Sequence, residues 1–212
     1  MTNLVTYTLK TAALGAVFAM MAMLSANAQV MASLPSPTES IEVNGRKAKP
    51  VSAWVDFCNR HAEECAVDTN EAAVITMTPN IWKQLVQVNR KVNRDVKPVT
   101  DMDHWGVADK WDLPTDNKGD CEDYQLLKRK LLAEQGLPRR AMRMTVVLDE
   151  EGEGHAVLMV RTTQGDYILD NKTSAILPWG ETNYVYVKQE GNIDQQWVSL
   201  GGVTSPTTTA KN

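Results

Sequence analysis

Cys121 is the residue whose surroundings most directly suggest chemistry. It stands in the segment GDCEDY (119–124), between Asp120 and Glu122 and just before Asp123. A thiol attacks as its thiolate, and neighbouring negative charge opposes the loss of the proton. A position at the start of a helix has the opposite effect, because the unsatisfied N–H groups and the helix dipole lower the pKa of a cysteine. The segment therefore predicts either a nucleophile whose acids are neutralised by another group or an inert cysteine beside solvated acids.

Two further residues would complete a nucleophilic triad with this cysteine. His155 follows Gly154 at the beginning of one predicted strand, and Asp170 ends the next. An antiparallel hairpin around TQGD would make them neighbours across the ladder. The imidazole would take the thiol proton, and the carboxylate on the other ring nitrogen would fix the tautomer. Each residue alone also fits a structural role, but their combination in a chain with three histidines favours catalysis.

The remaining cysteines, Cys58 and Cys65, predict a disulfide. The chain has three cysteines, and pairing these two leaves Cys121 free in an oxidising compartment. Residues seven apart on one unbroken helix lie roughly 10.5 Å apart along its axis, too far for a disulfide, so the helix must end between them. Two alternatives stay open: a metal site formed by Cys58, His61 and Cys65, and a pair of unpaired core thiols.

Helical signals come first along the chain. Thr78 followed by Pro79 is a typical helix start, and Gly136 is a typical helix end. Residues 99–118 show no clear period and are interpreted as a structured loop. The predicted helices cover 52–60 with Ser52 as the cap, 79–96, and 121–135 with Asp120 at the N-cap and a buried stripe of Tyr124, Leu127, Leu131 and Leu132.

Strand signals fill the second half of the chain. Short turns separate the first three strands, which predicts an antiparallel meander. Helices followed by hairpin-linked strands indicate an α+β fold in which N-terminal helices pack on an antiparallel sheet. The predicted strands are AMRMTVVLD (141–149), GHAVLMVRT (154–162), DYILDN (166–171), NYVYVKQ (183–189) and a weaker QQWVSL (195–200).

The ends of the chain predict export. Residues 1–28 contain a short apolar run after Lys10 and end in a small-x-small pattern, which predicts a signal peptide cleaved after Ala28 and a periplasmic protein. An uncleaved anchor is the alternative. We expect an extended leader over 29–50, one domain over 51–200 and a flexible tail over 201–212. The formal net charge of −4 and the lack of a basic stripe argue against nucleic acid as a partner.

From about Trp54 to Trp179, the sequence resembles the bacterial transglutaminase-like cysteine peptidases. The motifs that carry the resemblance are W-x-x-F-C…E-C, the loop from Trp105 to Trp111, GDCEDY, GHAVL and LDN. The resemblance implies a papain-like fold of the transglutaminase type. It further implies Cys121 as the nucleophile, His155 as the general base and acid, and Asp170 as the orienting carboxylate.

The resemblance also implies calcium, because activity in family members depends on an ion bound by the acids beside the cysteine. The matching positions are Asp120 and Glu122, with Asp123 as an addition. Calcium takes about six to eight oxygen ligands, and the local sequence does not fit an EF-hand. Further ligands must therefore come from elsewhere, such as the Asp101–Asp103 loop or backbone carbonyls. The alternative is that these acids only cap and solvate the helix start.

The sequence thus predicts an exported cysteine peptidase, a hydrolase acting through an acyl-enzyme, without an organic cofactor. Trp105 or Trp111 would wall the substrate cleft, although a core role fits each tryptophan. By resemblance, the substrate is a large surface adhesin in biofilm control, and the partner is an inner-membrane cyclic di-GMP receptor. The competing functions are acyl transfer by a transglutaminase or amidase with the same triad, and a non-catalytic binding module of the same fold.

Overall fold

The computed structural model describes residues 34–43, 45–193 and 195–201. All of them belong to one compact unit that begins at residue 31. The predicted signal peptide (1–28) lies outside the described residues, as does the predicted tail beyond residue 201. Within the described ranges, none of the helices combines the length and the apolar character that crossing a bilayer requires.

A seven-stranded sheet forms the centre of this unit, in the order β1-β9-β8-β4-β5-β6-β7. Every neighbouring pair in it is antiparallel. The predicted meander is confirmed, since β4, β5 and β6 follow one another in sequence and in space. The strands are β1 (Lys47–Ala48), β4 (Met142–Leu148), β5 (Gly154–Thr162), β6 (Gly165–Leu169), β7 (Leu177–Pro178), β8 (Val185–Glu190) and β9 (Trp197–Ser199).

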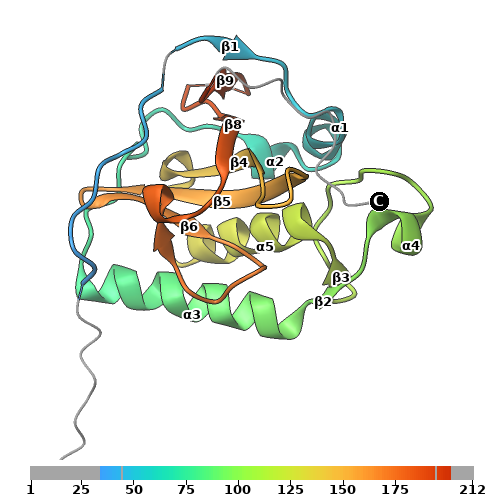
Figure 1. The fold of residues 1–212 in the computed structure, drawn as a ribbon, viewed down its shortest axis with the longest axis horizontal. Helices are drawn as coiled ribbons and strands as arrows, with labels where there is room; N and C mark the ends of the chain where they lie inside the picture. Colours follow the sequence, from blue (N-terminus) through green and yellow to red (C-terminus); the bar gives the residue numbers. More distant parts are fainter. Residues whose placement is uncertain (1–33, 44, 194, 202–212) are drawn as a thin grey trace, which may run out of the picture. The chain divides into compact units, whose positions relative to one another are not determined.

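Helix α5 (Cys121–Glu134) lies between the sheet and helix α3 (Pro79–Asp95), as Figure 1 shows. It is therefore covered on two sides, and polar residues such as Gln125 and Lys128 are fully buried. Of the predicted buried stripe, Tyr124 and Leu132 are buried, whereas Leu127 and Leu131 are only partly buried. The chain leaves α5 at Gly136, whose φ of 88° is the left-handed conformation that glycine adopts easily.

Helix α3 begins where the sequence predicted, with the Thr78 side chain accepting a hydrogen bond from Ile81 N at 3.2 Å. The stretch after it is more ordered than expected. It contains a short parallel pair, β2 (Lys97–Pro98) with β3 (Lys118–Gly119), and helix α4 (Asp101–Trp105). Thr100 caps α4 by accepting from Asp103 N at 3.2 Å. Residues 99–118 are thus fixed at both ends beside the start of α5.

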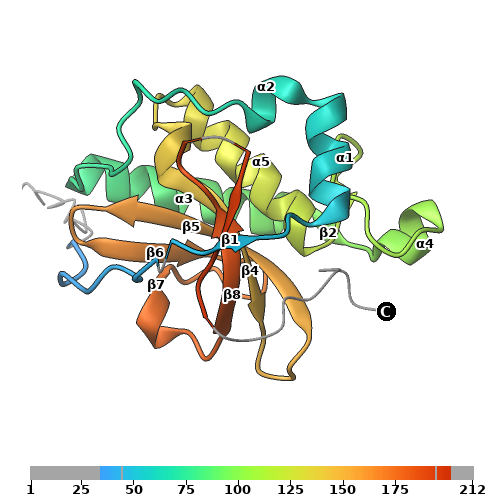
Figure 2. The ribbon, with the colours of Figure 1, turned by 90° about the horizontal axis from the view of Figure 1, so that it is seen from above.

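The described part of the predicted leader is extended but tied to the sheet. Thr38 N donates to Gln164 O at 2.9 Å, and Ile41 N donates to the buried carboxylate of Asp166 at 3.0 Å. Gly165, the first residue of β6, has a φ of 110°, and a Cβ there would collide with Thr38. Figure 2 shows this segment running along the sheet toward β1.

The predicted disulfide between Cys58 and Cys65 is confirmed, with an S–S distance of 2.01 Å, which rules out the metal-site and free-thiol alternatives. As the geometry requires, helix α1 (Ser52–Arg60) ends before α2 (Ala62–Cys65) begins. Ser52 is not the cap it was predicted to be, because Val51 occupies that position and makes no side-chain cap.

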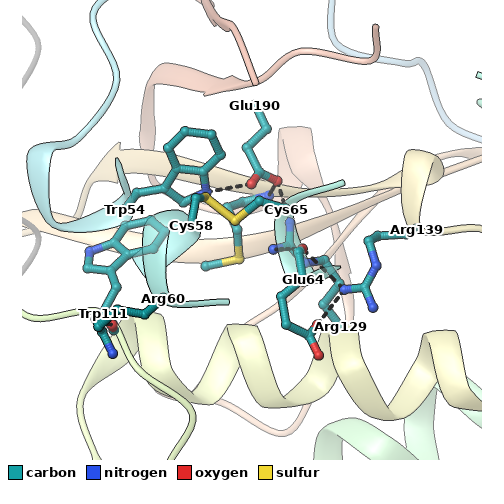
Figure 3. The surroundings of a disulfide bond; sticks show 10 residues. Trp54, Cys58, Arg60, Glu64, Cys65, Trp111, Arg129, Arg139 and Glu190 are labelled. Atoms are coloured by element: carbon teal, nitrogen blue, oxygen red, sulfur yellow. Dashed lines mark hydrogen bonds and ion pairs between the residues drawn. A yellow bond between two sulfur atoms is a disulfide. The ribbon is translucent and has the colours of Figure 1, made fainter. Parts of the chain in front are cut away.

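Around this disulfide lies a group of paired charges that we call the arginine–glutamate network (Figure 3). Its members are Glu64, Arg129, Lys130, Arg139 and Glu190. Arg129 donates to Glu190 Oε2 at 2.5 Å and to the Glu64 carbonyl at 3.0 Å. The Glu64 carboxylate binds Lys130 at 2.7 Å and Arg139 at 2.6 Å. The network therefore joins α2, the middle of α5 and strand β8.

Candidate active site

Cys121 is the first residue of α5, with 7% of its surface exposed. Its Sγ accepts a hydrogen bond from Ala156 N on β5 at 3.4 Å and donates one to Glu122 Oε2 at 3.1 Å. Asp120 stands at the N-cap position, but its side chain does not cap the helix. Asp120 Oδ2 instead accepts from Asp101 N at 3.3 Å, which links the start of α5 to α4.

His155 and Asp170 meet where β5 begins and β6 ends. His155 Nε2 lies 3.0 Å from Asp170 Oδ1, and both residues are buried. Asp170 Oδ1 also accepts from Lys172 N at 3.0 Å. Burial raises the pKa of Asp170, but the hydrogen bond and the charge of His155 outweigh it, so the pKa is held below its usual value. This pairing leaves Nδ1 as the ring nitrogen for chemistry.

Cys121 and His155 line the same cavity, which has a volume of about 410 Å³. The hydrogen bond from Ala156, next to His155 in sequence, also holds the two elements together. The cavity wall includes Thr100 and Asp103 from the α4 region and Asn171 and Lys172 beyond β6. The structure thus brings a thiol and an imidazole to one opening at the start of α5, and the imidazole contacts the buried carboxylate of Asp170.

Acidic side chains crowd behind the cysteine in what we call the acidic cluster: Asp101, Asp109, Asp120, Glu122 and Asp123. Ligand atoms of Asp101, Asp109 and Glu122 lie within 4.8 Å of one another, and so do those of Asp101, Asp120 and Asp123. The predicted metal residues thus fall into two groups that share Asp101. One carboxylate oxygen of Asp101 and one of Asp120 are buried without a hydrogen-bond partner among the described residues.

Burial and mutual repulsion control the proton affinity of these acids. Burial, followed by the charge of Asp120, raises the pKa of Asp101 to about 6. Burial also raises the pKa of Asp123 to about 9, and it raises that of Glu122 well above its usual value, with Asp120 and Asp123 adding to the effect. The pKa of the Cys121 thiol is raised too, first by burial and then by Glu122 and Asp120. The helix start alone therefore does not produce the expected thiolate.

The glycine before this segment allows the close packing of the acids. Gly119 is buried, and a Cβ at this position would collide with the carboxylate of Asp123. Asp123 Oδ1 in turn accepts from Asp112 N at 2.8 Å, so its side chain folds back over the chain that precedes α5. A larger residue at 119 would displace Asp123 from the cluster.

The two candidate cleft tryptophans lie away from this cavity. Trp111 is fully buried and packs edge-on against Trp197, with ring centroids 6.3 Å apart, so the core interpretation is correct for it. Trp105 is 47% exposed, and the ammonium of Lys110 lies 3.6 Å from its ring centroid. Neither tryptophan is among the residues that line the cavity beside Cys121. The expected cleft role is wrong for the buried Trp111, and for Trp105 it stays a prediction.

Sequence reasoning missed three residues of this region. Asp109 was not considered, and Asp101 was named only as part of a loop that might supply ligands. Tyr184, just before β8, was read only as a strand residue, yet its hydroxyl donates to Asp170 Oδ2 at 2.5 Å. The density of acids between 101 and 123 was a usable signal for the first two. No local pattern marks Tyr184, because its contact depends on the path of the chain after β6.

Comparison with known proteins identifies relatives of this arrangement. The sequence model of the family described as bacterial transglutaminase-like cysteine proteinases matches residues 43–205. A solved structure of Legionella pneumophila LapG is 28% identical, with a TM-score of 0.49, and the match covers 57% of this chain and 70% of that one. The structure described as calcium-bound Legionella pneumophila LapG is 22% identical, with a TM-score of 0.50 and coverage of 76% and 87%. No curated protein matched the sequence.

Proposed function

Because the chain belongs to the bacterial transglutaminase-like cysteine proteinases, we propose that Cys121, His155 and Asp170 form its catalytic triad. Family membership makes the protein a cysteine peptidase of the transglutaminase-like type with a protein substrate. The observation that carries the triad is the 3.0 Å contact between His155 and Asp170, at the cavity that His155 shares with Cys121.

The mechanism follows from which ring nitrogen is occupied. Asp170 holds His155 Nε2, so Nδ1 takes the proton of the Cys121 thiol. The thiolate attacks the carbonyl of the peptide bond, and the imidazolium then protonates the leaving amine. In the second half, neutral His155 removes a proton from water as it attacks the acyl-enzyme, and the proton returns to the thiolate on release. Asp170 keeps the ring in position and stabilises its charged form throughout.

We also propose that the acidic cluster binds calcium. Calcium prefers about six to eight oxygen ligands, many of them carboxylates. The residues fit this requirement, since Asp101 and Asp120 each bury an oxygen that has no hydrogen-bond partner among the described residues, and the five carboxylates form two groups that share Asp101. When bound, the ion supplies positive charge that offsets the acids beside the Cys121 thiol. A structure of the same fold is described as calcium-bound.

We also propose a location, a substrate and a regulatory partner for this peptidase. Residues 1–28 would direct export to the periplasm, where the enzyme would cleave a large surface adhesin and so control attachment in a biofilm. An inner-membrane receptor for cyclic di-GMP would be the regulatory partner. The support is the signal-peptide pattern, with cleavage after Ala28, and the resemblance of the GDCEDY, GHAVL and LDN motifs to those of the family.

Cleavage of adhesin fragments from the same cell tests these proposals. The mature protein is mixed with each fragment in calcium, beside Cys121→Ala and His155→Ala variants. We expect defined fragments with the wild type alone, and a melting temperature for Cys121→Ala close to that of the wild type. Cleavage by Cys121→Ala would refute the triad. Incorporation of a labelled amine into a glutamine peptide would instead favour acyl transfer.

A further inference from the structure

Tyr184 contacts both members of the His155–Asp170 pair. Its hydroxyl donates to Asp170 Oδ2 at 2.5 Å. Its ring meets the imidazole of His155 edge to face, with centroids 5.7 Å apart and planes inclined by 72°. One side chain therefore touches the carboxylate and the imidazole at the same time.

The hydroxyl completes the set of donors around a buried charge. Asp170 is only 2% exposed, so its carboxylate depends on protein donors rather than water. Oδ1 accepts hydrogen bonds from His155 Nε2 and Lys172 N, while Oδ2 accepts one from the Tyr184 hydroxyl. With both oxygens engaged, the carboxylate plane has a defined orientation, and that orientation sets the direction of the bond to His155.

Tyr184 lies outside the cavity that Cys121 and His155 share. It lines two hollows on other sides, one of about 110 Å³ shared with Asp170 and one of about 830 Å³ shared with Trp179. The part of a substrate that fills the Cys121 cavity therefore does not meet this ring, and the contacts that link Tyr184 to the cavity run through Asp170 and His155.

We propose that Tyr184 is a positioning residue of the peptidase reaction, whose hydroxyl orients Asp170 and whose ring holds the plane of His155. This inference rests on the proposed triad. The neighbouring Tyr186 provides a matched control. Its hydroxyl binds Thr182 Oγ1 at 2.9 Å and Trp179 O at 3.2 Å, and it contributes nothing to the Cys121 cavity. Tyr184→Phe and Tyr186→Phe each remove one hydroxyl group, at positions that are two residues apart in the sequence.

The first measurement is the rate of alkylation of Cys121 by iodoacetamide in saturating calcium, which needs no knowledge of the natural substrate. A hydrogen bond to a charged group is strong enough that we expect Tyr184→Phe to slow alkylation by about tenfold and Tyr186→Phe by less than about twofold. Equal rates for the two variants would overturn the inference. If His155→Ala also reacts at the wild-type rate, the triad itself fails. If only His155→Ala is slow, the triad stands and the role of Tyr184 is refuted.

The second measurement is independent of reactivity. Proton NMR of the Cys121→Ala protein with labelled histidine should show a downfield, slowly exchanging Nε2–H resonance for His155. Tyr184→Phe in this background should shift that resonance and speed its exchange, while Tyr186→Phe leaves it in place. A variant that merely loosened the fold would shift all three histidines of the chain. An unchanged His155 signal in Tyr184→Phe would contradict the proposal.

Discussion

Two buried glutamates, Glu122 and Glu64, have opposite electrostatic surroundings. Glu64 is 3% exposed and Glu122 is 0% exposed. Burial raises the pKa of Glu64, but Lys130 and Arg139 outweigh this effect and lower it. Burial raises the pKa of Glu122 as well, and there Asp120 and Asp123 increase it further. One acid is thus held as a paired anion, whereas the other shares its site with like charges.

This difference separates a structural region from a functional one on the same helix. The arginine–glutamate network surrounds the middle of α5, and each of its acids has a cationic partner within the chain. The acidic cluster, which includes Asp101, surrounds the start of α5 next to Cys121. A buried charge must be paired or must coordinate a metal. The network therefore needs no ion from solution, whereas the acids of the cluster either hold protons, as their raised pKa values allow, or bind the calcium ion that we propose.

The largest effect on stability should come from breaking the network. Arg129→Met leaves Glu190 buried with donors from Trp54 and Met144 but without its cation. Removing one partner of a buried pair typically costs about 3–5 kcal/mol. We expect this loss in urea unfolding both with calcium and with a chelator, because the network does not depend on the ion.

Arg94→Met is the control for this variant. Arg94 also pairs with an acid, Asp95 at 2.8 Å, but its side chain is 70% exposed. Exposed pairs contribute little, so the unfolding midpoint should barely change. Comparable losses for the two arginines, or a loss in Arg129→Met that disappears in calcium, would contradict the separation of the two regions.

Calcium itself should stabilise the protein through the acidic cluster. A ligand at about 100 times its dissociation constant adds about 2.7 kcal/mol, which corresponds to roughly 5–10 °C for a chain of this size. Asp101→Asn should abolish this shift, because Asp101 belongs to both ligand groups. The same variant should raise the melting temperature in chelator, since it removes one of the repelling charges. Differential scanning calorimetry measures both effects.

Glu64→Gln should behave in the opposite way to Asp101→Asn. This variant weakens the contacts with Lys130 and Arg139 and should lower the melting temperature under both conditions. Its response to calcium should nevertheless equal that of the wild type. If Glu64→Gln lost the calcium shift, or Asp101→Asn kept it, the ion would bind elsewhere and the proposed ligand set would be wrong.

The sequence predicted the parts of this fold that depend on local signals. Thr78–Pro79 marked the start of α3, and the spacing of short turns marked the β4–β6 meander. It also paired Cys58 with Cys65 and required a helix break between them, which the structure places at His61. Each of these features depends on residues that are close together in the sequence, so local patterns are enough to predict it.

What could not be predicted depends on contacts between distant segments. Asp101 enters the acidic cluster because α4 is tied to Asp120, 19 residues away in sequence. Trp111 is in the core because it meets Trp197 of the last strand. Tyr184 reaches Asp170 only through the return of the chain after β6. The spacing of residues in the sequence carries no information about such contacts. The motifs therefore predicted the candidate triad, but they did not predict the residues that support it.

The dependence of stability on pH should reverse its sign when calcium is added. The pKa of Asp101 is 3.8 in its ordinary state and about 6 in the fold, so between these values the folded chain holds a proton that the unfolded chain releases. Stability in chelator should therefore fall as pH rises from 5 to 6, by about 1.4 kcal/mol per proton and pH unit. Asp123, with a pKa of about 9, continues the fall toward neutral pH. Calcium binds deprotonated ligands, so its stabilisation should grow over the same range.

Melting curves between pH 5 and 8 can resolve this reversal because the paired acids contribute little there. The pKa values of Glu64 and Asp149 are lowered, and stability from such acids is present above the unfolded pKa and lost only as the pH falls below it. The slope above pH 5 thus reports the acidic cluster. In chelator, Asp101→Asn should remove the part of the slope that Asp101 contributes between pH 5 and 6, and Glu64→Gln should leave the slope unchanged. A fall in stability with rising pH that is the same with and without calcium would show that the ion does not bind the acids around Cys121.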